Sequence, residues 1–119
     1  MEHASILVVD DEALIRMATM DIMEDAGYSA VGAANAEEAI IMLERCPDIS
    51  AVLTDINMPG SMDGLQLSRL IRDRWPLIGL VVTSGRFLAK AAQMPAGVRF
   101  IAKPYTPSEI VSALQSCAA

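Results

Sequence analysis

Three short runs of apolar residues constrain the fold of this chain more than any other feature. They are SILVV at residues 5–9, ISAVLT at 49–54 and IGLVVT at 78–83. A continuous apolar run of this length is typical of a strand that is buried on both faces, and such strands occur in parallel sheets. YSAVGAA at 28–34 predicts a weaker strand. VRFIA at 98–102 alternates more, which favours an edge strand with Arg99 directed away from the core.

Amphipathic segments with helix-end signals separate these runs. Residues 13–26 carry an apolar stripe, and Gly27 follows as the predicted C-terminal cap. The stripe consists of Ile15, Ala18, Ile22 and Ala26. The residues at their N-termini predict three further helices. Asn35 and Glu38 resemble a capping box for a helix at 36–45, and Asp63 is the predicted cap of the next helix. The motif TPSE at Thr106–Glu109 begins the last one. Strands that alternate with helices predict a doubly wound α/β fold, with one domain over residues 1–119.

The segment between Thr83 and Val98 departs from this regular alternation. It reads SGRFLAKAAQMPAG, and Pro95 ends any helix within it. We therefore expect the fourth helix of the domain to be short or irregular.

Composition excludes several classes of function. The chain has 119 residues, of which 53% are hydrophobic, and a net charge of −6 without a basic stripe, which argues against disorder and against nucleic-acid binding. His3, in the N-terminal tail, is the only histidine, which excludes histidine-based catalysis and most zinc sites. Cys46 and Cys117 lack a metal-type spacing and are interpreted as reduced thiols. No apolar run reaches membrane-spanning length and the N-terminus does not resemble a signal peptide, so we expect a cytoplasmic protein.

Polar residues follow four of the five predicted strands, at the point where each strand ends. They are Asp10, Asp11 and Glu12 after the first strand, Asp55 after the third, Thr83 and Ser84 after the fourth, and Lys103 after the fifth. In open parallel α/β sheets, ligands bind beyond the carboxyl ends of the strands. The sequence therefore predicts that a ligand site lies at this edge of the sheet.

The residue types at these positions indicate which ligand the site would take. If the first and third strands are neighbours, Asp10, Asp11 and Asp55 crowd together and repel one another. A hard divalent cation removes that conflict, and Mg²⁺ prefers one or two carboxylates together with water and a phosphate. Lys103 would add a fixed positive charge and Ser84 a hydroxyl donor. Together these groups predict a site for Mg²⁺ and a phosphoryl group.

Four motifs carry a resemblance to a known family. VVDDE, DINMP, TSG and KPY stand at these strand ends in the order and setting of the receiver domain of bacterial response regulators. The resemblance covers essentially the whole chain and implies a five-stranded parallel sheet in the flavodoxin-like order 2-1-3-4-5. It also implies that Asp55 accepts a phosphoryl group from a sensor histidine kinase or a phosphotransfer protein.

The resemblance implies roles for the other motif residues. Asp10 and Asp11 are similar to the family's acidic pair, with Asp11 as the direct Mg²⁺ ligand, and Asn57 matches the position whose backbone carbonyl binds the metal. Lys103 resembles the family's lysine, whose bond to the following proline is usually cis. Ser84 matches the switch hydroxyl, because the small Gly85 follows it.

Three positions depart from the family pattern. Phe100 occupies the position of an aromatic residue that changes rotamer on activation, but it lacks the hydroxyl of the commoner tyrosine. One extra residue around Gly60 and Ser61 predicts a bulge in the loop after Asp55. The segment from Ser84 to Lys103 is shorter than in the family, which puts the usual output surface of fourth helix, fifth strand and fifth helix in doubt.

The resemblance implies a signalling domain and not an enzyme, apart from catalysis of its own phosphorylation and dephosphorylation. Such a domain acts by binding an unidentified output partner or by relaying phosphate, without direct contact to nucleic acid or membrane. Only SCAA follows the last predicted helix, so no output domain is expected. A fragment of a longer regulator would show the same features.

Two other functions stay open at this point. A Mg²⁺-dependent phosphohydrolase with an aspartyl-phosphate would have a second acid two residues after the nucleophile, where this chain has Asn57. A pseudo-receiver would be an interaction module that is never phosphorylated. Each residue singled out also has a structural interpretation, with Asp55 as a turn residue, Ser84 as a cap, Lys103 as a solvated loop residue and Phe100 as core. Polar groups at four separate strand ends favour the functional interpretation.

Overall fold

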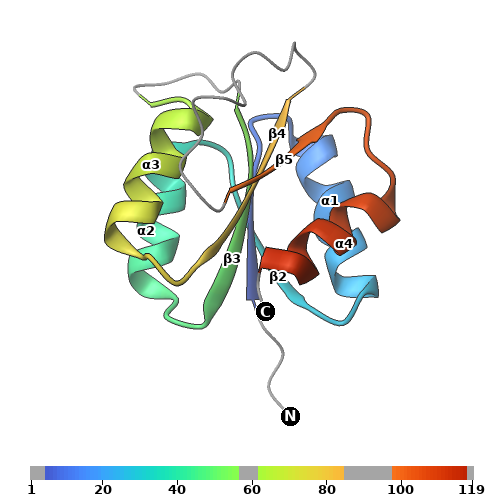
Figure 1. Ribbon diagram of the computed structural model, residues 1–119, viewed down its shortest axis with the longest axis horizontal. Helices are drawn as coiled ribbons and strands as arrows, with labels where there is room; N and C mark the ends of the chain where they lie inside the picture. Colours follow the sequence, from blue (N-terminus) through green and yellow to red (C-terminus); the bar gives the residue numbers. More distant parts are fainter. Residues whose placement is uncertain (1–4, 57–61, 85–97, 118–119) are drawn as a thin grey trace.

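Five parallel strands form one sheet in the order β2-β1-β3-β4-β5 (Figure 1). The strands are β1 at Ser5–Val9, β2 at Ser29–Ala33, β3 at Ile49–Asp55, β4 at Gly79–Ser84 and β5 at Arg99–Ala102. The computed structural model describes residues 5–56, 62–84 and 98–117. The predicted fold class and strand order are therefore confirmed.

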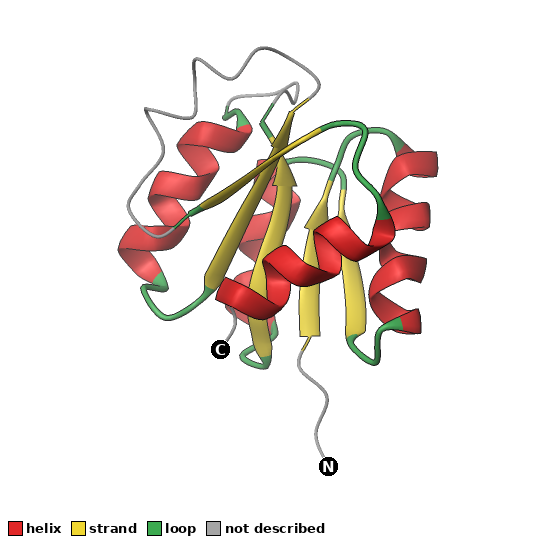
Figure 2. Cartoon of the chain, turned by 45° about the vertical axis from the view of Figure 1, so that its right-hand side comes forward, coloured by secondary structure: helices red, strands yellow, loops and turns green. Residues whose placement is uncertain are grey.

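Four helices cover the two faces of the sheet within the described residues (Figures 1 and 2). They are α1 at Ala13–Asp25, α2 at Ala36–Arg45, α3 at Gly64–Arg74 and α4 at Pro107–Cys117. Helices α2 and α3 pack on one face, and α1 and α4 pack on the other. The short or irregular fourth helix expected between Thr83 and Val98 lies outside the described residues, as does the bulge expected around Gly60 and Ser61.

Two apolar cores lie on opposite faces of the sheet. In β1, Leu7 and Val9 enter the core under α2 and α3, which we call the first core. Ile6 and Val8 enter the core under α1 and α4, the second core. Because successive side chains of a strand point to opposite faces, a strand between two helical layers is apolar at most of its positions. This is the physical reason for the continuous apolar runs in the sequence.

The helix ends follow the predicted capping patterns with one difference. Asp63 and Gln66 form a reciprocal capping box at α3, and Thr106 and Glu109 form one at α4. At α2 the Asn35 side chain accepts from the Glu38 N–H, but the Glu38 carboxylate accepts from Ala34 N–H instead of Asn35 N–H. Gly27 follows α1 with φ +97°, a conformation that glycine adopts at little cost.

The predicted apolar stripe of α1 is wrong in part. Ala18 and Ala26 are exposed, and the buried residues of the helix are Thr19 and Met23. The helix carries apolar residues on several sides, including the exposed Leu14, so periodicity alone did not identify the side that faces the sheet. Among the described residues, no helix combines the length and the apolar character that crossing a bilayer requires.

Candidate functional site

The carboxyl ends of β1, β3 and β5 bring the predicted charged residues together. One carboxylate oxygen from each of Asp10, Asp11 and Asp55 lies within 4.8 Å of the others. The ammonium of Lys103 lies 3.1 Å from Asp55 Oδ2 and 3.4 Å from Asp10 Oδ2. The predicted convergence of these four residues is confirmed. Lys103 offsets part of the carboxylate repulsion, which the sequence argument had assigned to a cation alone.

Asp10 is held at every one of its polar groups. Its N–H donates to Ala33 O at 3.1 Å, and its carbonyl accepts from Arg16 Nη1 at 2.7 Å. Its Oδ1 accepts from the Glu12 N–H at 2.9 Å, and Oδ2 pairs with Lys103. Only 4% of the residue is exposed. Asp10 therefore has a fixed position and orientation.

Asp11 has the opposite environment although it is the next residue. It is exposed, and it makes no hydrogen bond to any residue that the structure describes. Its carboxylate is nevertheless close enough to those of Asp10 and Asp55 to share a cation with them. Asp11 is therefore the acid of this cluster whose side chain is free to adjust to a ligand.

Asp55 ends β3, and a close backbone approach from α3 supports it. The Gly64 N–H donates to Ile56 O at 3.0 Å. A Cβ at Gly64 would collide with the Asp55 carbonyl oxygen and would lie 2.6 Å from Ile56 Cα. Only glycine lets the first turn of α3 approach the end of β3 this closely. Gly64 was not predicted from the sequence, although a glycine in the first turn of a helix, where it has no propensity advantage, was an available signal.

Lys103 is fixed to β4 as well as to the acids. Its N–H donates to Ser84 O at 2.9 Å, and the Lys103–Pro104 peptide bond is cis, as the resemblance implied. Burial by itself would lower the pKa of Lys103, but the hydrogen bond and negative charge of Asp55, with those of Asp10, raise it above 10.5. The lysine is therefore a permanent positive charge at neutral pH.

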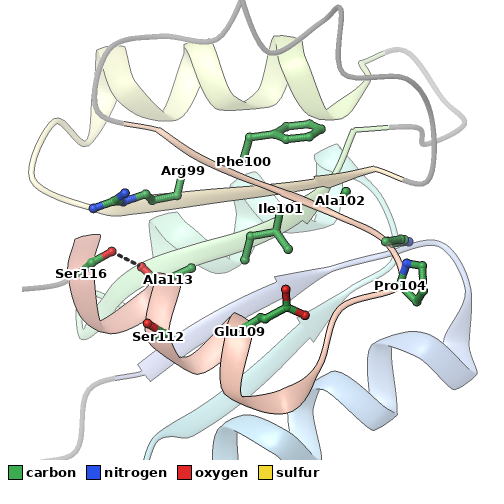
Figure 3. Close-up of a pocket in the computed structure, with 10 residues that line it drawn as sticks. Arg99, Phe100, Ile101, Ala102, Pro104, Glu109, Ser112, Ala113 and Ser116 are labelled. Carbon is green, nitrogen blue, oxygen red and sulfur yellow. Dashed lines mark hydrogen bonds between the residues drawn. The ribbon is translucent and has the colours of Figure 1, made fainter.

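The two predicted switch residues lie beside this charged cluster. Ser84 is buried at the end of β4. Phe100 is half-buried against Ile56, Leu65 and Val82. Figure 3 shows Phe100 on the opposite side of β5 from Ile101, which points toward α4. Phe100 thus belongs to the sheet face under α3, near the end of β3.

Several residues weighed in the sequence are not part of this cluster. Asn57, the predicted backbone ligand, and His3 lie outside the described residues. Cys46 is a half-buried free thiol at the end of α2, remote from the carboxylates, and the Cys117 side chain is also outside the described part. Arg99 is exposed on β5, as predicted for the edge strand.

The donor set of the cluster fits a hard divalent cation. Three carboxylates against one ammonium leave an excess of two negative charges in a small volume. Carboxylate oxygens are the ligands that Mg²⁺ prefers, and the exposed position of Asp11 leaves room for the water that this ion keeps. The chemistry of the cluster therefore fits a divalent cation, with the ammonium of Lys103 beside it.

Comparison with known proteins gives consistent matches. Residues 6–115 match the model of the response regulator receiver domain family. The chain is 38% identical to the chemotaxis protein CheY of Thermotoga maritima over 114 residues, which covers 92% of each protein. A crystal structure of a response regulator receiver protein from Sinorhizobium medicae WSM419 is similar, with a TM-score of 0.91 and 29% identity, over 98% of this chain and 95% of that one.

Some curated relatives are much longer than this chain. A putative NtrX-like response regulator of Rickettsia bellii is 35% identical over 120 residues, which covers 97% of this chain but only 25% of that protein. The chain therefore spans about a quarter of the length of such relatives.

Proposed function

Because the chain belongs to the family of response regulator receiver domains, we propose that it accepts a phosphoryl group on Asp55. The donor is a sensor histidine kinase or a phosphotransfer protein, and the phosphorylated domain binds an output partner or relays the phosphoryl group. The observation that carries this proposal is the position of Asp55, with Lys103 3.1 Å away and two further acids within ligand distance.

The environments of the three acids favour Asp55 as the acceptor. Asp10 is fixed by bonds to all of its polar groups, so its carboxylate cannot turn toward a donor. Asp11 is exposed, where water would have free access to an acyl phosphate. Asp55 is only 7% exposed, and it lies next to the permanent positive charge of Lys103. Asp55 thus combines shelter from water with a neighbour, Lys103, that can pair with a phosphoryl oxygen. Asp10 is equally sheltered and also pairs with Lys103, but it differs in being held at all of its polar groups.

The transfer step uses Asp55, Lys103 and Ser84 of this site together with the imidazole of the donor. A carboxylate oxygen of Asp55 forms a bond to phosphorus, while the bond from phosphorus to the donor's imidazole nitrogen breaks and the electron pair leaves with that nitrogen. Lys103 and the Ser84 hydroxyl pair with oxygens of the transferred group. Phe100 either fills the space that Ser84 leaves when that side chain moves toward the phosphoryl group, or its apolar ring stays buried throughout.

Asp10, Asp11 and Asp55 would hold Mg²⁺, together with the backbone carbonyl of Asn57. When bound, the ion supplies the positive charge that links these carboxylates to phosphoryl oxygens. Asp11 is the acid with room to adjust to the ion, whereas Asp10 would offer its carboxylate from a fixed position.

An apolar surface beside the acids is available to a protein donor. Helix α1 begins two residues after Asp11, and its Leu14 and Met17 side chains are 83% and 60% exposed. Large apolar side chains exposed side by side are typical of interaction sites. The net charge of −6 supports a protein partner over nucleic acid or an anionic membrane, and a donor kinase supports a cytoplasmic location.

Phosphorylation by a small phosphodonor tests this proposal. The protein is incubated with Mg²⁺ and phosphoramidate, and the added mass and its position are measured by mass spectrometry. We expect one phosphoryl group on Asp55 in the wild type and none in Asp55→Asn. Asp48→Asn, which removes an exposed carboxylate at the other end of β3, is the matched control and should be labelled like the wild type.

The same assay separates the alternatives. Steady release of phosphate from added phosphoesters would indicate a phosphohydrolase instead. A wild-type protein that takes no label and releases no phosphate would be a pseudo-receiver, and the proposal would be wrong. A label elsewhere than Asp55 would contradict the assignment of the acceptor.

Binding of Mg²⁺ is a separate prediction from the same cluster. Mg²⁺ at about ten times its dissociation constant should stabilise the folded protein by about 1.4 kcal/mol and raise the melting temperature accordingly. Asp11→Ala should abolish most of this shift, because it removes the adjustable ligand. Thermal unfolding with and without Mg²⁺ measures both, and an undiminished shift in Asp11→Ala would place the ion elsewhere.

A further inference from the structure

Helix α1 contacts both of the loops that carry the opposite charges of the site. Arg16 Nη1 donates to the backbone carbonyl of Asp10 at 2.7 Å. Thr19 Oγ1 lies 2.9 Å from the hydroxyl of Tyr105, and the two hydroxyls share a hydrogen bond. Tyr105 follows Lys103 by two residues. Figure 1 shows α1 and the loop before α4 side by side.

The two contacts come from one side of the helix. Arg16 and Thr19 are three residues apart, so their side chains are neighbours on the helix surface. One contact reaches the loop after β1 and the other reaches the loop after β5. Helix α1 therefore links these two loops, in addition to the bonds that tie each of them to the sheet.

The path of Arg16 depends on a glycine in β2. A Cβ at Gly32 would lie 3.2 Å from Arg16 Cδ and 2.9 Å from Met20 Sδ. Distances this short require the neighbouring side chains to move. The missing side chain of Gly32 therefore leaves the space through which the arginine stem crosses β2 toward Asp10.

The contact of Thr19 with Tyr105 is sheltered from water. Thr19 is 2% exposed, and Tyr105 is half-buried against the second core. A buried hydroxyl that loses its partner pays its full desolvation cost, so each hydroxyl holds the other in place. The loop from Lys103 to Tyr105 is thereby tied to α1 at one end, and the Lys103 N–H ties it to β4 at the other.

We infer that Arg16 and the Thr19–Tyr105 pair are positioning residues, which hold Asp10 and Lys103 at the separation on which the site depends. Neither contact reaches the acids' carboxylates. Arg16 acts through the backbone of Asp10, and Tyr105 acts through the loop that carries Lys103. The role in phosphoryl transfer rests on the proposed function, whereas the effect on cation binding does not.

The two contacts predict opposite changes in Mg²⁺ affinity. Arg16→Met releases the backbone of Asp10, so the acid cluster is less well ordered for the ion and Mg²⁺ should bind about threefold more weakly. Tyr105→Phe releases the loop of Lys103, which competes with the cation for Asp10 and Asp55. Mg²⁺ should therefore bind about threefold more tightly in this variant. General destabilisation of the protein would not move the two affinities in opposite directions.

Phosphorylation rates give the second measurement. Tyr105→Phe and Thr19→Val should each lower the maximal rate of labelling by phosphoramidate about tenfold, with an unchanged half-saturating concentration of the phosphodonor. The double variant should be no slower than either single variant, because both remove the same contact. Arg16→Lys should recover part of the rate that Arg16→Met loses.

Tyr28→Phe is the matched control. Tyr28 is the only other tyrosine and packs against the same core, at the opposite end of the sheet. It should leave the Mg²⁺ affinity and the labelling rate at the wild-type values.

The inference is wrong if Mg²⁺ binds Arg16→Met and Tyr105→Phe as it binds the control, or if both affinities shift in the same direction. If Tyr105→Phe is labelled at the same rate as the control, the Thr19–Tyr105 pair does not position the loop that carries Lys103. If the wild type takes no label, the proposed function fails, but the signed changes in Mg²⁺ affinity still decide the positioning role.

Discussion

The two ends of the sheet differ in how their charges are balanced. At the carboxyl end, three carboxylates lie close together, and one ammonium pairs with the two that are buried, Asp10 and Asp55. At the amino end, the charged side chains that form pairs are exposed. Ser5 Oγ donates to Asp48 Oδ2 at 2.7 Å, and Arg74 pairs with Glu44 at 2.8 Å.

The amino end also ties its loop to α3. Arg72 Nη1 donates to the carbonyls of Pro76 and Ile78, and the guanidinium of Arg74 lies 4.4 Å from the centre of the Trp75 ring. Trp75 itself packs against the first core. The amino end therefore contributes stability, whereas the carboxyl end keeps an unbalanced charge that is useful only when a cation or phosphoryl group arrives.

Glycine substitutions should show the largest difference between the ends. Gly64→Ala, at the carboxyl end, places a Cβ against the backbone of Asp55 and Ile56, and should cost about 3 kcal/mol of the free energy of unfolding. At the amino end, the Cβ of Gly27→Ala would meet no atom within 4 Å. The strain of an alanine at φ +97° is then the only cost, and it should lower the free energy of unfolding by about 1 kcal/mol. Urea denaturation measures both, and equal losses would contradict the close approach at Gly64.

Trp75→Ala should separate stability from function. It removes a half-buried ring from the first core and should lower the free energy of unfolding by about 2 kcal/mol. Because Trp75 lies at the amino end, the rate of labelling on Asp55 should stay at the wild-type value. Unfolding monitored by circular dichroism measures the loss of stability, and the phosphoramidate assay measures the labelling rate. A labelling rate that falls with stability would show that the two ends are coupled.

Removal of one carboxylate charge should have opposite effects at the two ends of β3. Asp55→Asn lowers the repulsion with Asp10 and Asp11 while Lys103 keeps Asp10 as a partner, so we expect a gain of about 1 kcal/mol in stability without metal. Asp48→Asn weakens the charge-assisted bond from Ser5 and should lose a few tenths of a kcal/mol. Parallel urea titrations in a metal chelator test this. A clear loss of stability in Asp55→Asn would mean that the pair with Lys103 outweighs the repulsion.

The smallest expected effect is the alkaline pH dependence that Lys103 brings to the carboxyl end. Its folded-state pKa is raised above 10.5, so its charge stabilises the fold fully below that pH. This contribution is lost as the pH rises through the raised pKa. Lys103→Met should therefore lose less stability than the wild type between neutral pH and pH values above 10.5. Denaturation midpoints of the two proteins are measured at matched pH values. If the midpoints of both fall in parallel as the pH rises, the stabilising role of the Lys103 charge is wrong.

The fold was predictable because the sheet is buried on both faces. Each inner strand had to be apolar at most of its positions, and this leaves a nearly continuous apolar run that can be detected without structural knowledge. Asp10, Asp55 and Lys103 were predictable for a related reason, since polar residues that end such runs in a parallel sheet must share one edge. The capping residues Asp63 and Thr106 follow from local hydrogen bonding alone.

The features that were missed depend on contacts between distant segments. Gly64 is required by the backbone of Asp55, and Gly32 by the stem of Arg16, neither of which any periodicity records. The bond between Thr19 and Tyr105 joins residues 86 positions apart. On α1, the buried Thr19 is polar and the exposed Leu14 is apolar, so hydrophobicity identified the buried side of the helix only in part. Tertiary packing decided each of these positions.

The location of Trp75 has a spectroscopic consequence. It is the only tryptophan in the chain, and it sits on the first core at the amino end, away from every acid of the site. Its emission should therefore follow the loss of packing when the domain unfolds and should stay unchanged while Mg²⁺ or a phosphoryl group occupies the opposite end. One intrinsic fluorophore thus gives the same unfolding signal for the wild type and for every variant at the carboxyl end.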